Sequence, residues 1–248
     1  MNLLGYAISV DNLTKFFGKT LAVDHISFNI REGMIFGLLG PNGAGKTTTI
    51  RMLTTVLRPD EGIAKILDYN VIEDSIRVRE VIGVLPEDAG LYDRLTPVEM
   101  LIFHGKLRGM NKDVIIEKTN KFLTMLRLQE NRDQKIGTFS KGMKQKMALI
   151  RAIFHEPKVI FLDEPTVGLD VMSTRDIRKL ITEESSRGST IVLSTHNMVE
   201  AQQLCREVAI IDRGRIVSQG TVETLEKLTH EESLEDVFVH LVRGEAAE

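Results

Sequence analysis

The stretch GPNGAGKTTT, from Gly40 to Thr49, constrains the fold of this chain more than any other. It follows an apolar run over 33–39 that is typical of a buried strand, and a helical period begins at Lys46. The stretch matches the pattern G-x-x-x-x-G-K-[ST] between a strand and a helix, which is the context of a phosphate-binding loop. Gly43 and Gly45 allow the backbone to curl so that successive amides point at a phosphate. We therefore predict a nucleotide-phosphate site here.

A second element of such a site, which supplies acidic residues, is KVIFLDEPT, an apolar strand that ends in Asp163 and Glu164. Lys46 is placed to reach the β- and γ-phosphate oxygens, and the Thr47 hydroxyl and Asp163 are placed to hold Mg²⁺. Glu164, one residue further on, is a candidate general base, because a carboxylate near the γ-phosphate can accept a proton from an attacking water. The pair predicts hydrolysis of the bound nucleotide as well as binding.

The pattern along the chain predicts an α/β fold. Two alternating strand-like segments fill the first thirty residues, and the region from about 88 to 156 is mostly helical, with Thr96 and Pro97 in N-cap and N1 order. Buried strands and helices then alternate, which implies parallel strands with crossover helices. We expect a P-loop NTPase core of mostly parallel strands, an antiparallel β subdomain and a helical insertion. Two short helices are expected over 221–241.

Composition excludes several classes of protein. The 248 residues carry 32 Lys and Arg against 35 Asp and Glu, a net charge of −3 that argues against wrapping of nucleic acid. The single cysteine, Cys205, cannot form an intrachain disulfide and is expected to be a buried bystander. No apolar run approaches the roughly 18 residues of a membrane span, and the N-terminus lacks the pattern of a signal peptide. We expect a soluble, cytoplasmic protein that binds no nucleic acid.

The loop and helix TFSKGMKQKMALIRAIF, residues 138–154, leave two interpretations open. A helix N-terminus with unpaired amides and nearby lysines, among them Lys141 and Lys144, attracts an anion. The same residues also fit an ordinary capped surface helix with solvated lysines. Taken alone, the stretch favours the surface helix.

Four segments, the P-loop, FSKGM, VIFLDEPTVGLD and STHNM, resemble in order and spacing the nucleotide-binding subunits of ABC transporters. The resemblance covers about residues 6 to 241 and implies one ABC ATP-binding domain over that range. It implies a catalytic core with the antiparallel entry sheet over 1–87 and 157–220, a helical subdomain over 88–156, and C-terminal helices and a tail over 221–248.

The same resemblance gives the loop at 139–143 a function. It is similar to the signature motif that faces ATP held by a second subunit, so that two copies sandwich two Mg-ATP head to tail. Ser140 and the amide of Gly142 would contact the partner's γ-phosphate. Lys141 and Met143 stand where most relatives carry glycine and glutamine, a spelling that resembles ATPases of the drug and sodium exporter branch.

Further roles come residue by residue from the resemblance. Phe17 would stack on adenine, with Phe16 as the competing neighbour, and His196 would bond the γ-phosphate and orient the catalytic group. Glu87 stands where most relatives carry a glutamine. Gly168, Leu169 and Asp170 resemble the loop that links the two sites across the dimer. The complete ATP-binding set is Phe17, Gly40, Pro41, Asn42, Gly43, Ala44, Gly45, Lys46, Thr47, Thr48, Glu87 and Asp163, with Thr47, Glu87 and Asp163 as metal ligands and Glu164 and His196 as catalytic residues.

The leading hypothesis for function is the ATPase subunit of an ABC exporter. It would act as a homodimer docked on separate transmembrane permease subunits, at the inner face of the cell membrane. The tail SLEDVFVHLV, 233–242, also resembles the exporter branch. Two alternatives remain: an importer subunit, which often carries an extra regulatory domain, and a soluble ABC ATPase acting on ribosomes or DNA. The sequence does not identify a cargo.

Overall fold

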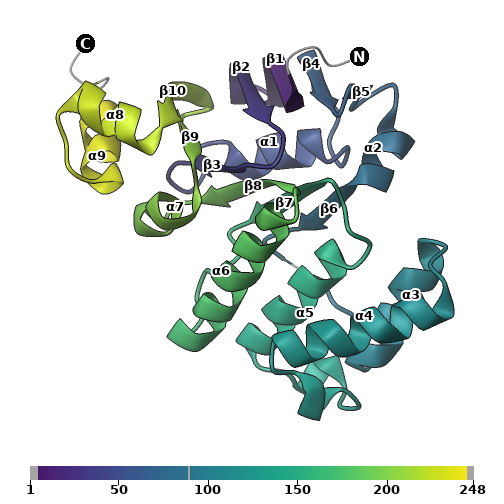
Figure 1. The fold of residues 1–248 in the computed structure, drawn as a ribbon. Helices are drawn as coiled ribbons and strands as arrows, with labels where there is room; N and C mark the ends of the chain where they lie inside the picture. The colour runs from purple at the N-terminus through teal and green to yellow at the C-terminus, as the bar shows by residue number, and fades with distance from the viewer. Residues whose placement is uncertain (1–4, 89, 245–248) are drawn as a thin grey trace.

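We describe residues 5–88 and 90–244 from a computed structural model. The structure contains two β-sheets with helices packed around them (Figure 1). The N-terminal sheet has four strands in the order β2-β1-β4-β5, and each neighbouring pair is antiparallel. Its strands are β1 Tyr6–Phe17, β2 Thr20–Arg31, β4 Glu61–Ile66 and β5 Tyr69–Asn70. This confirms the predicted antiparallel entry sheet.

The larger sheet has six strands in the order β10-β9-β3-β8-β7-β6. All neighbours pair in parallel except β10 with β9. Its strands are β3 Ile35–Leu39, β6 Ile82–Leu85, β7 Val159–Asp163, β8 Thr190–Thr195, β9 Glu207–Asp212 and β10 Arg215–Thr221. The mostly parallel α/β core is therefore confirmed, and β3, which leads into the P-loop, lies between β8 and β9.

Helices cover the larger sheet and form a separate group at one end (Figure 1). The predicted start of α3 is confirmed: Thr96 caps the helix by accepting from Glu99 N, and Pro97 occupies the first turn. Two short helices follow β10, as the pattern over 221–241 predicts. The helices are α1 Lys46–Leu53, α2 Ser75–Val81, α3 Pro97–Leu107, α4 Lys112–Met125, α5 Lys141–Ile153, α6 Val171–Ser186, α7 Met198–Leu204, α8 Val222–Thr229 and α9 Leu234–Gly244, with 3-10 turns at Gln129–Asn131 and Ile136–Thr138.

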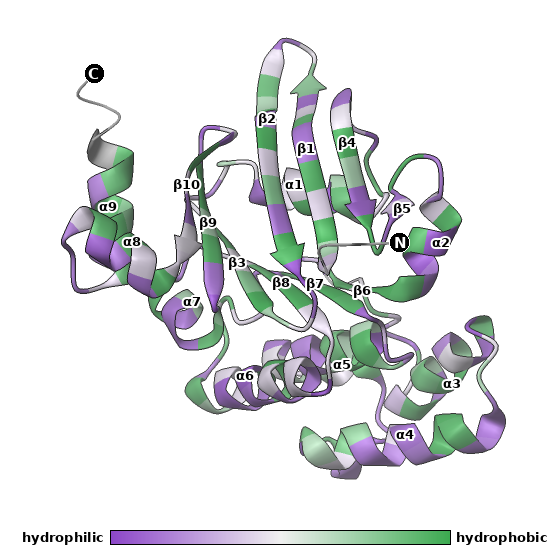
Figure 2. Ribbon diagram, turned by 45° about the horizontal axis from the view of Figure 1, so that its top comes forward, coloured by the Kyte–Doolittle hydropathy of each residue, from purple (hydrophilic) through white to green (hydrophobic). Residues whose placement is uncertain are grey.

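Alternate side chains of the parallel strands belong to two different hydrophobic clusters, one on each face of the sheet. Along β7, Ile160 and Leu162 join the cluster that includes α5 and α6, whereas Val159 and Phe161 join the cluster that includes α1 and the N-terminal sheet. Because both faces are covered, these strands are almost continuously hydrophobic (Figure 2). The polar groups of the sheet are thereby concentrated at the strand ends, where the candidate site lies.

Two expectations concern single features. Cys205 is a free, buried cysteine, and burial raises the pKa of its thiol, so the predicted inert position is confirmed. Within the residues described, no helix combines the length and the apolar character needed to cross a membrane. The division of the chain near 87, 156 and 220 stays a prediction, and its segments 1–4 and 245–248 lie outside the described residues.

Candidate functional site

The P-loop curls between the end of β3 and the start of α1, as predicted. Gly43 and Gly45 have φ of 82° and 110°, and Gly45 is the N-cap of α1. A Cβ at Gly40 would lie 2.1 Å from the Ile211 carbonyl oxygen, and one at Gly45 would lie 2.8 Å from the Ala22 carbonyl oxygen. These glycines are required by close backbone approach and by left-handed backbone, which side chains disfavour.

A cavity of about 380 Å³ opens over this loop. It brings Glu87 and Glu164, which are far apart in sequence, to the P-loop. Ala22 also lines it and was not predicted, because it lies within β2, a strand of the other sheet. The full lining is Ala22, Asn42, Gly43, Gly45, Lys46, Thr47, Thr48, Glu87 and Glu164.

Lys46 is folded back onto its own loop. Its Nζ donates to the carbonyl oxygens of Gly40 (2.7 Å) and Pro41 (3.0 Å), and it lies 3.6 Å from Glu164 Oε1. Burial lowers the pKa of Lys46, while the carboxylates of Glu164, Asp163 and Glu87 act in the opposite direction. Lys46 is thus a buried cation that two backbone carbonyls and the Glu164 carboxylate hold at the P-loop.

Asp163 is the last residue of β7, and Glu164 follows it beside the end of the neighbouring strand β8. Asp163 is buried and accepts a hydrogen bond from Ser194 Oγ, and the amide of Glu164 donates to the Ser194 carbonyl oxygen at 3.1 Å. Glu164 has φ of 49°, a left-handed conformation uncommon for a residue with a side chain. Ser194 was missed from the sequence, although it pairs with Asp163 in the parallel register and is the penultimate residue of β8, at the same edge of the sheet.

His196 follows β8 and contacts Glu164 directly. Its Nδ1 lies 2.8 Å from Glu164 Oε1, and 45% of its side chain remains exposed. Because an ionised carboxylate only accepts, Nδ1 carries the proton in this contact. Glu164 therefore lies between a histidine and a lysine at the edge of the cavity.

The predicted signature loop packs against the predicted dimer-coupling loop. Ser140 caps α5 by accepting from Met143 N at 3.2 Å. A Cβ at Gly142 would lie 2.5 Å from Ser173 Oγ, and one at Gly168 would lie 2.4 Å from Lys141 Nζ. None of Ser140, Lys141, Gly142 and Met143 lines the cavity over the P-loop.

Asp170 caps α6 at the end of the coupling loop. Its carboxylate accepts from the amide of Ser173 at 2.9 Å and from the Ser173 hydroxyl at 2.7 Å, and these bonds lower the pKa of Asp170. Gly168 has φ of 66°, which fits the predicted turn. Leu169 is partly buried and packs on the core cluster of α5 and α6.

Phe16 and Phe17 lie at the end of β1, next to the turn into β2. Both residues are exposed, at 40% and 51%, and Lys15 Nζ lies 5.9 Å from the centre of the Phe17 ring. Because strand alternation lets only one of the two rings face the base, the choice between Phe16 and Phe17 stays a prediction. Neither ring lines the phosphate cavity, and adenine stacking by Phe17 stays a prediction.

The donor set for a metal is small. In the described part of the chain, no three or more His, Cys, Asp or Glu residues form a group that could hold a metal ion. Magnesium, however, usually binds through one or two carboxylates together with substrate phosphates and water. Thr47 and Glu87 line the cavity, and Asp163 acts on the charge of Lys46, so these three residues fit an ion that phosphates help to bind.

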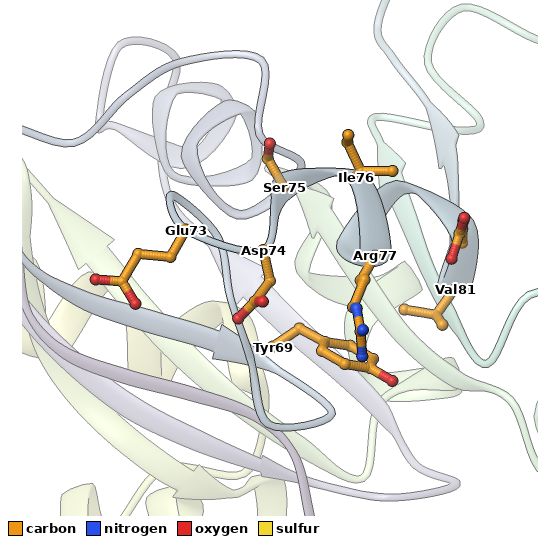
Figure 3. A pocket seen from close by; sticks show the side chains of 8 residues that line it. Tyr69, Glu73, Asp74, Ser75, Ile76, Arg77 and Val81 are labelled. Atoms are coloured by element: carbon orange, nitrogen blue, oxygen red, sulfur yellow. The ribbon is translucent and has the colours of Figure 1, made fainter.

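A larger cavity, of about 580 Å³, lies away from this chemistry between β5 and α2 (Figure 3). Its lining mixes acidic, apolar and cationic side chains, and the Arg77 guanidinium lies 5.7 Å from the Tyr69 ring. It contains none of the predicted site residues, so volume alone does not identify the functional site.

The fold and the site together define a P-loop ATPase, with the phosphate loop, the acidic strand end and the histidine on one edge of a parallel sheet. Residues 23–167 match the family model described as ABC transporter. The chain belongs to this family of ATP-binding proteins, whose members are ATPases.

Relatives and solved structures agree with this family. The ABC transporter ATP-binding protein NatA of Bacillus subtilis is 37% identical, over 90% of this chain and 92% of NatA. The Nod factor export ATP-binding protein I of Ralstonia nicotianae is 36% identical, over 94% of this chain and 72% of that protein. A solved ATP-binding subunit of an ABC transporter superposes with a TM-score of 0.89 at 28% identity, covering 95% of this chain and 99% of the other.

Proposed function

We propose that this chain is the ATP-hydrolysing subunit of an ABC exporter, in which two copies sandwich two Mg-ATP and drive separate membrane subunits. One observation carries the catalytic part. A single carboxylate oxygen of Glu164 lies 2.8 Å from His196 Nδ1 and 3.6 Å from Lys46 Nζ, at the edge of the P-loop cavity. A base, its orienting partner and a phosphate-binding cation thus meet at one point.

In the proposed mechanism Glu164 accepts the proton of the water that attacks the γ-phosphate. Lys46 leaves the carbonyls of Gly40 and Pro41 and binds phosphate oxygens, an exchange of neutral acceptors for charged ones. His196 holds the Glu164 carboxylate through Nδ1, so its orientation sets where the base points. Thr47, Asp163 and Glu87 would hold Mg²⁺, which supplies neutralisation of the phosphate charge.

The sandwich rests on the position of the signature loop. Ser140 and Gly142 lie at the N-terminus of α5, where free amides favour an anion, yet they do not line the cavity of their own subunit. A second copy is therefore the proposed source of the phosphate that they bind. The close packing of Gly142 on Ser173 and of Lys141 on Gly168 ties this loop to Asp170, the proposed link between the two sites.

A third cavity supports docking on a membrane subunit. It has a volume of about 450 Å³ and lies among the segment after α1, α2, β6, α3 and α5. The exposed Val56 (73%) lines it, and the exposed Leu107 (68%) precedes Arg108 of its lining. Pro86 lines this cavity and Glu87 lines the phosphate cavity. Consecutive residues therefore touch both, which gives nucleotide state a short physical route to a permease. We propose a location at the inner face of the membrane through that partner.

The direction of transport rests on the relatives. The Ralstonia protein is named for Nod factor export, and the residues Lys141 and Met143 resemble the signature motif of the drug and sodium exporter branch. An importer subunit is the alternative.

The experiment for the sandwich uses Glu164→Gln, which keeps the shape of the side chain but removes the base. We expect ATP to bind while turnover falls by 10²-fold or more. Light scattering after gel filtration in Mg-ATP should give about twice the mass of 27.9 kDa, against the monomer mass without nucleotide. A monomer with normal hydrolysis would contradict both the base and the dimer.

A further inference from the structure

Two loops carry the proposed catalytic groups, and little backbone pairing holds them together. The ladder between β7 and β8 ends with Asp163 opposite Ser194, and one further bond runs from the Glu164 amide to the Ser194 carbonyl oxygen. Beyond that point side chains connect the loops. The Glu164–His196 contact is one connection, but its members must respond to the substrate during turnover.

A second connection lies behind the first and uses a buried carboxylate that the mechanism has not used. The Thr166 hydroxyl lies 2.8 Å from each carboxylate oxygen of Glu200, whose relative exposure is 0%. Arg178 Nε of α6 donates to the same carboxylate at 3.2 Å, and Thr195 Oγ1 of β8 lies 3.5 Å from it. Glu200 therefore contacts the loop after β7, the end of β8 and the middle of α6.

The sequence position of Glu200 suggests a plainer role. It is the third residue of α7, after the N-cap Asn197, whose side chain accepts from the Glu200 amide at 3.0 Å. In a capping box a glutamate at this position would turn back to the N-cap amide. Here the Asn197 amide instead donates to Thr195 Oγ1 at 3.0 Å, and the carboxylate points into the protein. A buried ionised carboxylate requires such partners, so its contacts fix the segments that provide them.

We propose that Glu200 is a positioning residue for ATP hydrolysis. Through Thr166 it holds the loop that carries Glu164, and through its own helix and Thr195 it holds the segment that carries His196. Through Arg178 it also fixes α6, whose N-cap is Asp170. This proposal rests on the proposed roles of Glu164 and His196.

The test removes the Thr166–Glu200 hydrogen bond at Thr166, which is less buried than Glu200. Thr166→Val keeps the shape and removes the hydroxyl, and Thr166→Ser keeps the hydroxyl. We expect Thr166→Val to lower kcat about tenfold, the loss of one hydrogen bond to a charged group, with the KM for ATP changed less than about threefold. Thr166→Ser should restore most of the rate. Thr166→Val with Glu200→Leu should be no slower than Glu200→Leu alone, because that variant already lacks the carboxylate that accepts from Thr166.

The control is Glu184→Gln. Glu184 is also a buried carboxylate, and its partner Arg187 lies at the far end of α6 from the ATP site. The kcat of the Glu184→Gln variant should stay within about twofold of the wild-type value. Each variant is assayed well below its unfolding midpoint, so that loss of folded protein does not enter kcat.

Three results would overturn the proposal: a normal kcat for Thr166→Val, an equal loss in Thr166→Ser, or an equal loss in Glu184→Gln. Failure of the proposed function looks different. If Glu164→Gln and His196→Ala retained full turnover, the site assignment itself would be wrong. If they were inactive while Thr166→Val was normal, only the role of Glu200 would be lost.

Discussion

Replacing Lys46 by alanine tests the phosphate site most directly. The change removes the ammonium that lies 2.7 Å from the Gly40 carbonyl oxygen, 3.0 Å from that of Pro41 and 3.6 Å from Glu164. In the proposed ATP complex this group exchanges the two carbonyls for phosphate oxygens. Because Lys46 gives up two hydrogen bonds as it forms new ones, its net contribution to the free energy of ATP binding is smaller than the sum of the new hydrogen bonds.

We expect the loss to equal about one charge-assisted hydrogen bond, about 1.5–3 kcal/mol, which lowers ATP affinity by roughly 10- to 150-fold. Folding should suffer little. Burial lowers the pKa of Lys46, so below pH 10.5 the unfolded chain binds this proton more readily and the buried charge costs stability. Removing this buried charge offsets the two hydrogen bonds that the carbonyl oxygens of Gly40 and Pro41 lose.

Titration calorimetry with ATP measures the affinity, and thermal unfolding checks the fold. Lys118→Ala is the matched control, because it deletes a lysine of α4 that pairs with Glu156, just before β7 and at the opposite end of that strand from Asp163. Its ATP affinity should equal that of the wild type. If Lys46→Ala also bound ATP within twofold of the wild type, the reasoning about this lysine would be refuted.

Three other perturbations test separate parts of the structure. Ser140→Arg should leave ATP binding by the monomer intact but abolish dimerisation and turnover, measured by light scattering and phosphate release; surviving turnover would return the loop to a simple helix cap. Glu87→Gln should preserve ATP binding and change the Mg²⁺ dependence of turnover, and superimposable rate curves would remove Glu87 from the metal site. Burial lowers the pKa of His155 to about 4, below its unfolded value near 6.5, so stability should fall as pH drops from 6.5 towards 4. His155→Gln should flatten that fall in the unfolding midpoint, and an unchanged slope would assign it to other groups.

The sequence predicted the elements whose signals are local. The strand, loop and helix around Lys46 and the Thr96 cap of α3 each follow from neighbouring residues. Two strands of the larger sheet were missed: β6 has only four residues, and β10 is a polar edge strand without alternation. Both acquire their structure from a neighbour, so no short window reveals them.

The candidate site follows the same division. Glu164 and His196 were found because each lies next to a strand end within a motif. The contact between Glu200 and Thr166 joins residues 34 apart and depends on the side chain turning inward, which spacing does not indicate. Ser194 could have been found from parallel pairing alone, once the neighbour of β7 was known.

The order of the larger sheet has a consequence for synthesis on the ribosome. The strand that leads into the P-loop, β3, pairs with β8 and β9, whose residues extend to Asp212. A nascent chain exposes the entire P-loop early, but it lacks both flanking strands until most of the protein has been translated. The phosphate loop should therefore remain without a rigid base during most of elongation, because long-range pairing forms last. ATP would then stabilise only nearly complete chains, and truncated translation products would be left without that protection from proteolysis.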